Sequence, residues 1–373
     1  VCPVKDDRQL IISFSLPCLD SYYKHKPESL IAYLIGHEGP GSLLSYLKKK
    51  HWALRLSAGS GIHGSNFKDF NISIALTERG ESHIDDIICA FFSYMELLKS
   101  APVDETYFEE KKAISALSFN FQERVKPIES VSHLVMNMHY YPSEHYIYGD
   151  YIMEDINQPY LDMIMSYLTP TNLRIMHVSK QLSYDTTSHW YQVPYSVTPI
   201  TNEQIARWQS PEPHDDIHLP EKNPYIVKAP KIVEKEKIQS QPEIIDKSNG
   251  ITAWFKQDQS FDIPKGYIYL NIDIPVCVSS DINIAMTRLF INLFSDNVTE
   301  EHYNAELAGM HYHLYPHQSG MTLQISGVSE KQPLLLEKLI NSLRNQSFCE
   351  EKFNLFKFQL IKYIKNTQDS KSI

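Results

Sequence analysis

The sequence predicts an α+β protein made of two tandem homologous domains, the second of them incomplete. Three observations predict this fold. Segments with strand and helix patterns alternate along the 373 residues, their order recurs about 250 residues further on, and the second series stops before the last strand of the first. We therefore divide the chain into a first domain at 1–209, a proline-rich connecting segment at 210–250 and a partial second domain at 251–373.

The first domain begins and ends with a strand. Apolar residues at alternate positions indicate its strands, and apolar residues three or four positions apart indicate its helices, as in the series Ile84, Ile87, Phe91, Met95 and Leu98. In chain order we expect strand 11–16, helices 29–36 and 42–50 on either side of a Gly-Pro-Gly break, strands 53–58 and 70–76, helices 84–98, 108–112, 128–138 and 160–168, and strand 173–178.

The second domain repeats this order in part. Its expected elements are strand 269–274, helices 284–294 and 300–308, strands 310–315 and 321–326, and a helix that contains Phe353, Phe356, Leu360 and Ile364. Nothing in 251–373 corresponds to strand 173–178. We therefore expect the second sheet to lack its closing strand and to expose backbone donors and acceptors at that edge.

Composition narrows the function classes. The net charge of −10, from 35 basic and 45 acidic residues, disfavours binding to nucleic acid or to an anionic membrane. No apolar run reaches the roughly 18 residues of a membrane-spanning helix. The cysteines are scattered, which indicates mostly buried thiols rather than a zinc knuckle or a disulfide framework. They are Cys2, Cys18, Cys89, Cys277 and Cys349.

One segment shows which chemistry the chain lacks. Zinc peptidases with the sequence H-x-x-E-H bind the metal through two histidines one helical turn apart, and the glutamate activates water. That sequence is absent from the 373 residues. The nearest match is Tyr33 to His37, in which a phenol replaces the first imidazole and Gly36 replaces the glutamate. One histidine cannot hold a catalytic zinc, so we expect no catalytic residue and no metal site in this chain.

The segment Tyr33–Lys48, which contains this remnant, resembles the second domain of the insulysins, members of the pitrilysin superfamily of zinc metallopeptidases (family M16). Further similar segments are His139–Pro142, Trp190–Tyr191 with Tyr195, Trp254–Asp258, Ala305–Gly309 and Lys331–Pro333. The resemblance covers nearly the whole chain, as the second domain and the front half of the third. We expect Trp190 and Tyr191 to be packing residues.

The resemblance implies homologous α+β domains, each a mostly antiparallel sheet with helices packed on one face, which together enclose an unfolded peptide. In such enzymes the zinc belongs to the first domain, and the fourth supplies further active-site groups. The cofactor expectation is therefore none in this chain and zinc in the first domain of the parent enzyme.

In this family the second domain carries an exosite, which anchors the amino-terminal end of the substrate away from the zinc. An edge strand there pairs with the peptide backbone, a mode that is indifferent to side-chain identity. The matching positions are Gly36, Glu38, Leu56, Ser57, Ala58, Gly59 and Ser60. Glu38 is the candidate partner of the substrate ammonium group. Ser29, Ala32 and Tyr33 depart from the family pattern, and the bulk of Tyr33 could narrow the groove.

The plainer interpretation of these residues needs no ligand. Gly36 and the Gly-Pro-Gly sequence after it are then a helix break and restart, Glu38 is a solvated carboxylate, and residues 59–64 are a hairpin loop. The connecting segment 210–250 is either a flexible linker or, as the resemblance implies, an extended belt on the first domain.

Two functions remain open from the sequence. The first is the non-catalytic central part of an insulysin-type zinc metalloendopeptidase that degrades short peptides, in which the chain forms a chamber wall and the exosite. Its expected partners are peptide substrates, the remaining domains of the same enzyme and, through the open second sheet, a second copy in a homodimer. The alternative is a catalytically dead scaffold or peptide-binding protein with the M16 fold. The cytoplasm is the expected compartment.

Overall fold

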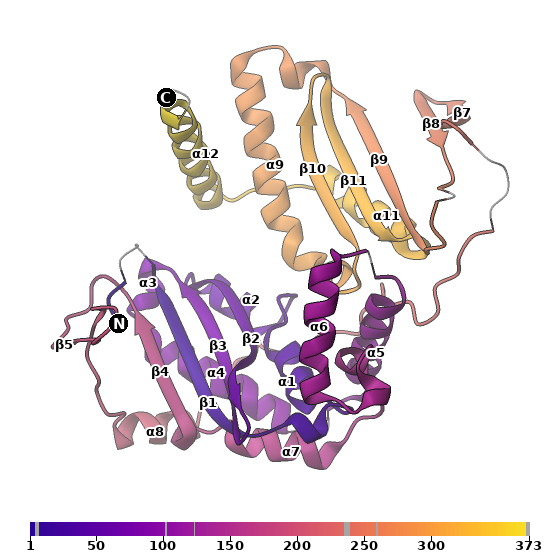
Figure 1. Cartoon of the computed structure of the whole chain (residues 1–373). Helices are drawn as coiled ribbons and strands as arrows, with labels where there is room; N and C mark the ends of the chain where they lie inside the picture. Colours follow the sequence, from indigo (N-terminus) through magenta and orange to yellow (C-terminus); the bar gives the residue numbers. More distant parts are fainter. Residues whose placement is uncertain (4–6, 101–102, 123, 235–238, 259, 371–373) are drawn as a thin grey trace. The chain divides into compact units, whose positions relative to one another are not determined.

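The computed structural model describes residues 1–3, 7–100, 103–122, 124–234, 239–258 and 260–370, with the backbone alone for 365–370 (Figure 1). The chain forms two compact units, Val1–Pro224 and Tyr225–Ile373, and each has its own hydrophobic core. Both units combine an antiparallel sheet with helices, so the predicted α+β class is confirmed.

The first unit contains a four-stranded antiparallel sheet in the order β2-β3-β1-β4. Its strands are β1 (Gln9–Pro17), β2 (Ala53–Gly64), β3 (Phe67–Leu76) and β4 (Leu173–Val178). Alternation accounts for them, since Phe70, Ile72 and Ile74 of β3 are buried and the residues between them are partly exposed. Because β1 pairs with β3 on one side and with β4 on the other, it is the inner strand next to the closing one.

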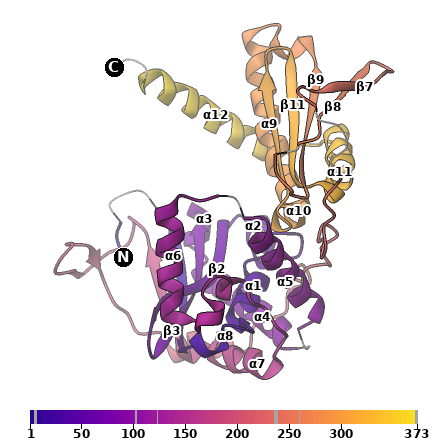
Figure 2. The same cartoon turned by 45° about the vertical axis from the view of Figure 1, so that its right-hand side comes forward.

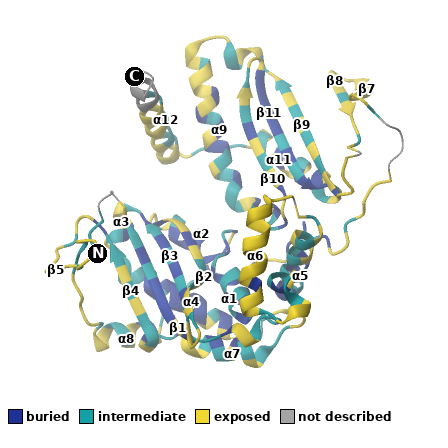
Figure 3. Cartoon of the chain, viewed as in Figure 1, coloured by how far each residue is buried: buried dark blue, intermediate teal, exposed yellow. Residues whose placement is uncertain are grey.

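Helices cover one face of this sheet, and buried residues gather between the two layers (Figure 3). Phe14 of β1 packs against Phe91 and Phe92 of α4, with ring centroids 5.9 and 6.3 Å away. The α-helices of the first unit, which do not all lie on that face, are α1 (Pro27–Ile35), α2 (Leu43–Lys49), α3 (Glu78–Glu81), α4 (Ile84–Lys99), α5 (Glu105–Asn120), α6 (Pro127–Tyr140), α7 (Gln158–Tyr167) and α8 (Asn202–Gln209). Short 3-10 helices are η1 (Asp20–Tyr22), η2 (Ser143–His145), η3 (Gly149–Tyr151) and η4 (Pro170–Asn172).

The predicted break between the first two helices is a helix end followed by a new start. Gly36 ends α1, and its N–H donates to the carbonyl of Ala32. Gly41 has a φ of 76°, the left-handed region that glycine adopts without a steric cost. The Ser42 hydroxyl then accepts the N–H of Ser45 at 3.1 Å and caps α2. The chain reverses here within a few residues.

The connecting segment divides between the two units. Residues 210–224 lie along the first unit, where Ile217 is part of the core and the Tyr107 hydroxyl donates to the carbonyl of Pro220 at 2.8 Å. From Tyr225, which is buried in the second core, the chain belongs to the second unit. A hairpin that the sequence analysis did not predict follows, formed by β7 (Glu243–Ser248) and β8 (Ile251–Phe255).

The second unit repeats the first in its sheet. Its order is β10-β11-β9, with β9 (Lys265–Asp273), β10 (His311–His317) and β11 (Gly320–Val328). Ile268 pairs with Ile325 here as Leu10 pairs with Ile74 in the first unit. Helices of this unit are η5 (Pro275–Val278), α9 (Asp281–Glu301), α10 (Tyr303–Leu307), η6 (Ser329–Lys331), α11 (Gln332–Arg344) and α12 (Glu350–Ser370). Across the described residues no strand holds the place that β4 has, which agrees with the predicted incomplete copy.

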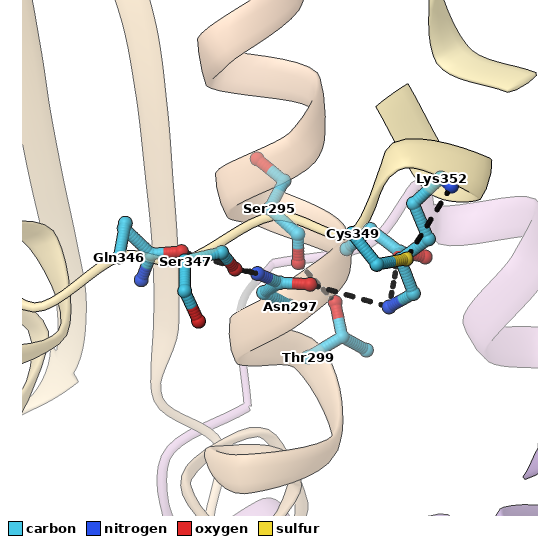
Figure 4. Close-up of polar contacts among 8 residues, drawn as sticks. Ser295, Asn297, Thr299, Gln346, Ser347, Cys349 and Lys352 are labelled. Carbon is cyan, nitrogen blue, oxygen red and sulfur yellow. Dashed lines mark hydrogen bonds and ion pairs between the residues drawn. The ribbon is translucent and has the colours of Figure 1, made fainter. Parts of the chain in front are cut away.

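A polar cluster fixes the start of α12 to α9 (Figure 4). The Asn297 carboxamide donates to Oε1 of Gln346 at 3.2 Å and to the carbonyl of Ser347 at 3.1 Å. The Lys352 ammonium donates to the Asn297 side chain at 3.2 Å and to Asp296 at 2.7 Å. Beyond these contacts α12 extends away from the three-stranded sheet (Figure 2).

Two sequence predictions are wrong. The five cysteines are not buried, since four are half-buried and Cys349 is exposed. Trp190 and Tyr191 are not packing residues either, because 85% and 87% of their surfaces are exposed. They lie in the turn between β5 (Thr186–Thr187) and β6 (Pro194–Tyr195), a two-stranded hairpin that is too small to bury its own turn.

Candidate peptide-binding site

Strand β2 is an edge strand. It pairs with β3 and with no other strand in the part of the chain that the structure describes. Along the outer side of such a strand, N–H and C=O groups point away from the sheet at alternate residues. An extended peptide can pair with these groups and lengthen the sheet by one strand.

The end of α1 lies directly against the middle of β2. A Cβ on Gly36 would lie 3.6 Å from the backbone nitrogen of Ala58 and 2.9 Å from the carbonyl oxygen of Ala32. At Gly59 a Cβ would meet nothing within 4 Å. The structure therefore brings Gly36 to the strand residues predicted with it, and it leaves open space beside the next residue of the strand.

The predicted strand residues have different surroundings. Leu56 is only 4% exposed and belongs to the first core, so its side chain anchors β2 and only its backbone can serve a ligand. Ala58 and Gly59 are half-buried, and Ser57 and Ser60 are exposed. Small side chains thus surround the accessible part of the strand, which allows another backbone to approach closely.

Glu38 lies in the turn between α1 and α2. It is half-buried, between the buried residues His37 and Gly39. A carboxylate two residues beyond Gly36 is close in sequence to the α1–β2 contact. Its charge is the chemical feature that an ammonium group would recognise.

The positions of the zinc-peptidase pentad hold no metal site. The Tyr33 hydroxyl donates to Oε2 of Glu110 at 3.5 Å, and Nδ1 of His37 accepts the N–H of Gly39 at 3.0 Å. The rings of Tyr33 and His37 meet edge to face, 6.4 Å apart. A phenol, a glycine and one engaged imidazole do not fit a zinc ion that needs three protein ligands and an activating carboxylate. Among the described residues no three His, Cys, Asp or Glu side chains form a group suited to a metal.

Sequence reasoning missed the role of Glu110. The carboxylate is nearly fully buried, and one oxygen accepts the N–H of Asn223 at 2.7 Å while the other accepts from Tyr33. Burial raises the pKa of Glu110, and the two hydrogen bonds oppose that rise. The helix pattern around residue 110 carries no signal for a contact with a backbone group 113 residues away.

A lysine beside Tyr33, with two further lysines near it in the charge network, was missed as well. The Lys111 ammonium lies over the Tyr33 ring, 5.5 Å from its centroid, and Lys68 forms an ion pair with Glu28 at 2.8 Å. Burial lowers the pKa of Lys111 and of Lys26. The Tyr33 side chain therefore has an ammonium group over its ring and a carboxylate at its hydroxyl.

Comparison with known protein families decides which family this fold represents. The description "Peptidase M16 inactive domain" matches residues 2–115, and "Middle or third domain of peptidase_M16" matches residues 119–373. The chain belongs to the M16 peptidase family. The word "inactive" in the first description agrees with the absence of an H-x-x-E-H sequence from this M16 chain.

Curated relatives point to the same family. The chain is 34% identical to the insulin-degrading enzyme of Bos taurus, over 98% of this chain and 36% of the relative. It is 31% identical to the nardilysin of Mus musculus, over 97% of this chain and 32% of the relative. An Arabidopsis thaliana relative named "Insulin-degrading enzyme-like 1, peroxisomal" is 29% identical. The M16 chain thus spans about a third of the length of these relatives.

A solved structure confirms the fold. Pitrilysin superposes with a TM-score of 0.83 and 24% identity, over 99% of this chain and 39% of the pitrilysin chain. In the described part of the M16 chain, no helix is both long and apolar enough to cross a membrane.

Proposed function

We propose that this chain is the non-catalytic central part of an insulysin-type zinc metalloendopeptidase that degrades short peptides. It forms part of the chamber wall and an exosite that anchors the amino-terminal end of the substrate. The single observation that carries this proposal is the contact of Gly36 with Ala58, which leaves the outer edge of β2 beside a small-residue helix end.

The exosite binds through backbone hydrogen bonds. The substrate adds to β2 as an extended strand along Leu56 to Ser60, and Glu38 receives its ammonium group. Since main-chain pairing does not depend on side chains, peptides of unrelated sequence bind alike. Anchoring one end holds the peptide while a distant bond is cleaved, which raises the effective concentration of that bond at the catalytic centre.

Cleavage of the peptide bond takes place in another part of the parent enzyme. The residues at 33, 36, 37 and 110 do not fit zinc, so a zinc ion in the parent requires ligands outside this chain. The chain by itself is then inert. Its partners are peptides and the remaining domains of the same enzyme, and the cytoplasm remains the expected compartment.

A peptide titration tests the exosite. The probe is a fluorescent peptide with a free amino terminus, and its acetylated form is the first control. We expect the Glu38→Gln variant to bind the free-terminus peptide about 10- to 100-fold more weakly, because a hydrogen bond to a charged group contributes about 1.5–3 kcal/mol. The matched control is Glu221→Gln, an exposed carboxylate in the same unit. Equal binding of both peptides to both variants would refute the role of Glu38.

The second candidate is a catalytically dead scaffold or peptide-binding protein with the M16 fold. The hydrogen bond between Tyr33 and Glu110 supports this candidate as much as the first one, since both require an inert domain here. The gene sequence before Val1 separates them. An H-x-x-E-H sequence with a downstream glutamate supports the peptidase, whereas a degenerate pentad supports the scaffold.

A further inference from the structure

We propose that Lys26, Lys68 and Lys111 form a subsite that receives the carboxylate of an acidic side chain of the bound peptide. The inference rests on the exosite proposed above and adds a substrate class to it, namely peptides with a glutamate or aspartate a few residues after a free amino terminus. Main-chain pairing with β2 makes no distinction between side chains. A preference among peptides therefore comes from groups beside the strand. The three lysines belong to the cap of α1, to β3 and to α5.

Two of the lysines contact α1 directly. The Lys68 ammonium forms an ion pair with Oε1 of Glu28 at 2.8 Å, and the two side chains are only 18% and 15% exposed. The Lys111 ammonium lies 5.5 Å from the centroid of the Tyr33 ring. Among the described residues this ammonium group has no hydrogen bond and no ion pair, so its N–H groups remain available to a ligand.

Lys26 adds a third positive charge near the other two. It is the cap residue before α1, at the end of the helix dipole that favours an anion rather than a cation. Its ammonium donates to the carbonyl of Gly149 at 3.2 Å, which is a neutral acceptor. Burial lowers the pKa of Lys26, and the neighbouring charges of Lys111 and Lys68 lower it further. Lys26 is therefore close enough to the other two ammonium groups to be repelled by both.

The carboxylates near these lysines do not balance their charge. Glu28 and Asp150 attract the Lys26 ammonium. Of these two, Glu28 also attracts the ammonium of Lys111, and it is already paired with Lys68. Asp150 accepts a hydrogen bond from a tyrosine hydroxyl at 2.8 Å. Among the described groups three lysines face two carboxylates, which leaves one excess positive charge in partly buried surroundings. An anion that reaches this place gains charge-assisted hydrogen bonds.

Helix α1 connects this lysine cluster with the edge of β2. At the end of α1, a Cβ on Gly36 would lie 3.6 Å from the backbone nitrogen of Ala58. In the first turn of α1, Glu28 contacts Lys68, which pairs with His63 of β2. Helix α1 therefore runs along β2 in the opposite direction. At about 1.5 Å per helical residue, the Glu28–Lys68 pair lies about 12 Å from the Gly36–Ala58 contact.

This spacing sets the position of the acidic residue in the peptide. A peptide that places its ammonium group at Glu38 and extends along β2 toward His63 advances about 3.3 Å per residue. It covers about 12 Å in roughly four residues, so its fourth or fifth side chain reaches the level of the lysines. Successive side chains point to opposite faces of a strand, so one of these two positions faces the lysine cluster and the other does not.

Peptide binding to the whole chain tests the proposal. The probes are fluorescent peptides with a free amino terminus that carry glutamate at position 4 or at position 5, each with a glutamine counterpart of otherwise identical sequence. We expect one of the two glutamates to tighten binding about tenfold over glutamine, because the carboxylate gains a charge-assisted hydrogen bond. Lys111→Met should remove this preference while its stem still packs on Tyr33. Lys180→Met, at an exposed lysine of the same unit, is the matched control and should keep the preference.

The glutamine peptides separate this proposal from the exosite itself. If they bind and the glutamate peptides bind no more tightly, the lysine subsite is refuted and the exosite stands. If neither kind binds, the exosite fails and the subsite with it. A glutamate preference that persists in both Lys111→Met and Lys26→Met would assign it to other residues and contradict the proposal.

Inorganic phosphate without peptide tests for a free anion at the same lysines. The proposal is overturned if phosphate raises the Tm of the wild type but not of Lys111→Met while the peptides show no glutamate preference. That result would assign the lysine cluster to a free anion instead of a peptide side chain.

Discussion

The carboxylate of Glu110 accepts the backbone N–H of Asn223 at 2.7 Å, although the two residues are 113 positions apart in the sequence. Both residues are buried. The contact joins α5 to the segment that leaves the first unit. The other oxygen of the same carboxylate accepts from the Tyr33 hydroxyl at 3.5 Å, so the pentad position 33 of this M16 domain belongs to a hydrogen-bonded cluster.

Replacing Glu110 should destabilise the first unit. We expect Glu110→Ala to cost about 1–3 kcal/mol, because the N–H of Asn223 is left buried without an acceptor. Glu110→Gln keeps an acceptor oxygen and should cost less. Urea unfolding measures both, with the exposed Glu105→Gln as control. Equal stability of the alanine variant and the wild type would show that the Glu110–Asn223 contact is dispensable.

The stability of the second unit should depend on pH through His302. This side chain is fully buried, and its Nδ1 has no hydrogen-bond partner. Its Nε2 lies 3.5 Å from the Ser342 hydroxyl, and the Tyr312 ring meets it edge to face. Burial lowers the pKa of His302, although Glu301 opposes the shift and Lys338 adds to it.

The sign of the pH effect follows from that shift. With the folded pKa below the unfolded value of 6.5, the unfolded chain takes up a proton first as the pH falls, so stability decreases from about pH 7 downward until the folded pKa is reached. Hydrogen exchange in α9 and α11 between pH 7 and pH 5 measures this loss. His302→Gln should flatten the dependence, whereas the exposed His311→Gln should not. A pH profile unaltered by His302→Gln would contradict the assignment.

The two copies should respond differently to the same core truncation. Ile12→Ala should cost about 2–5 kcal/mol, because Ile12 is fully buried between β3 and β4. Leu270→Ala, at the corresponding position of β9, should cost clearly less because its side chain is already partly exposed. Unit-resolved hydrogen exchange in urea compares them. Equal losses in the free energy of unfolding would mean that the side chain of Leu270 is as well buried as that of Ile12.

Two tryptophans give a matched comparison of burial. Trp208 of α8 is 1% exposed, and Trp190 is among the most exposed large side chains of the chain. We expect Trp208→Ala to cost about 3–5 kcal/mol and Trp190→Ala to change the stability by no more than about 0.5 kcal/mol. Urea unfolding of both variants checks this. A large loss for Trp190→Ala would show that the β5–β6 turn packs after all.

Local patterns in the sequence predict most of this fold. Apolar alternation predicts the bounds of β4 at Leu173 and Val178 correctly, and the Gly-Pro-Gly sequence predicts the restart at Ser42. The order of the predicted elements indicates the duplication from the sequence alone. These features depend on short-range geometry, which is why they can be read from neighbouring residues.

Long-range features were not predictable in the same way. Strand β2 continues to Gly64 through a register shift between Ser60 and His63, because pairing with β3 resumes at His63 and Gly64. The Glu110–Asn223 contact depends on how distant segments meet. The exposure of Trp190 follows from the absence of a layer against its hairpin, and its aromatic character alone favours the opposite expectation.

The most direct test of the central claim is hydrogen exchange at residues 54–60 during titration with a peptide that has a free amino terminus. The account predicts slower exchange at 56–60, a weaker effect in Glu38→Gln, and a peptide that remains uncleaved after prolonged incubation. Unchanged exchange at 56–60, or cleavage of the peptide that a metal chelator abolishes, would contradict it.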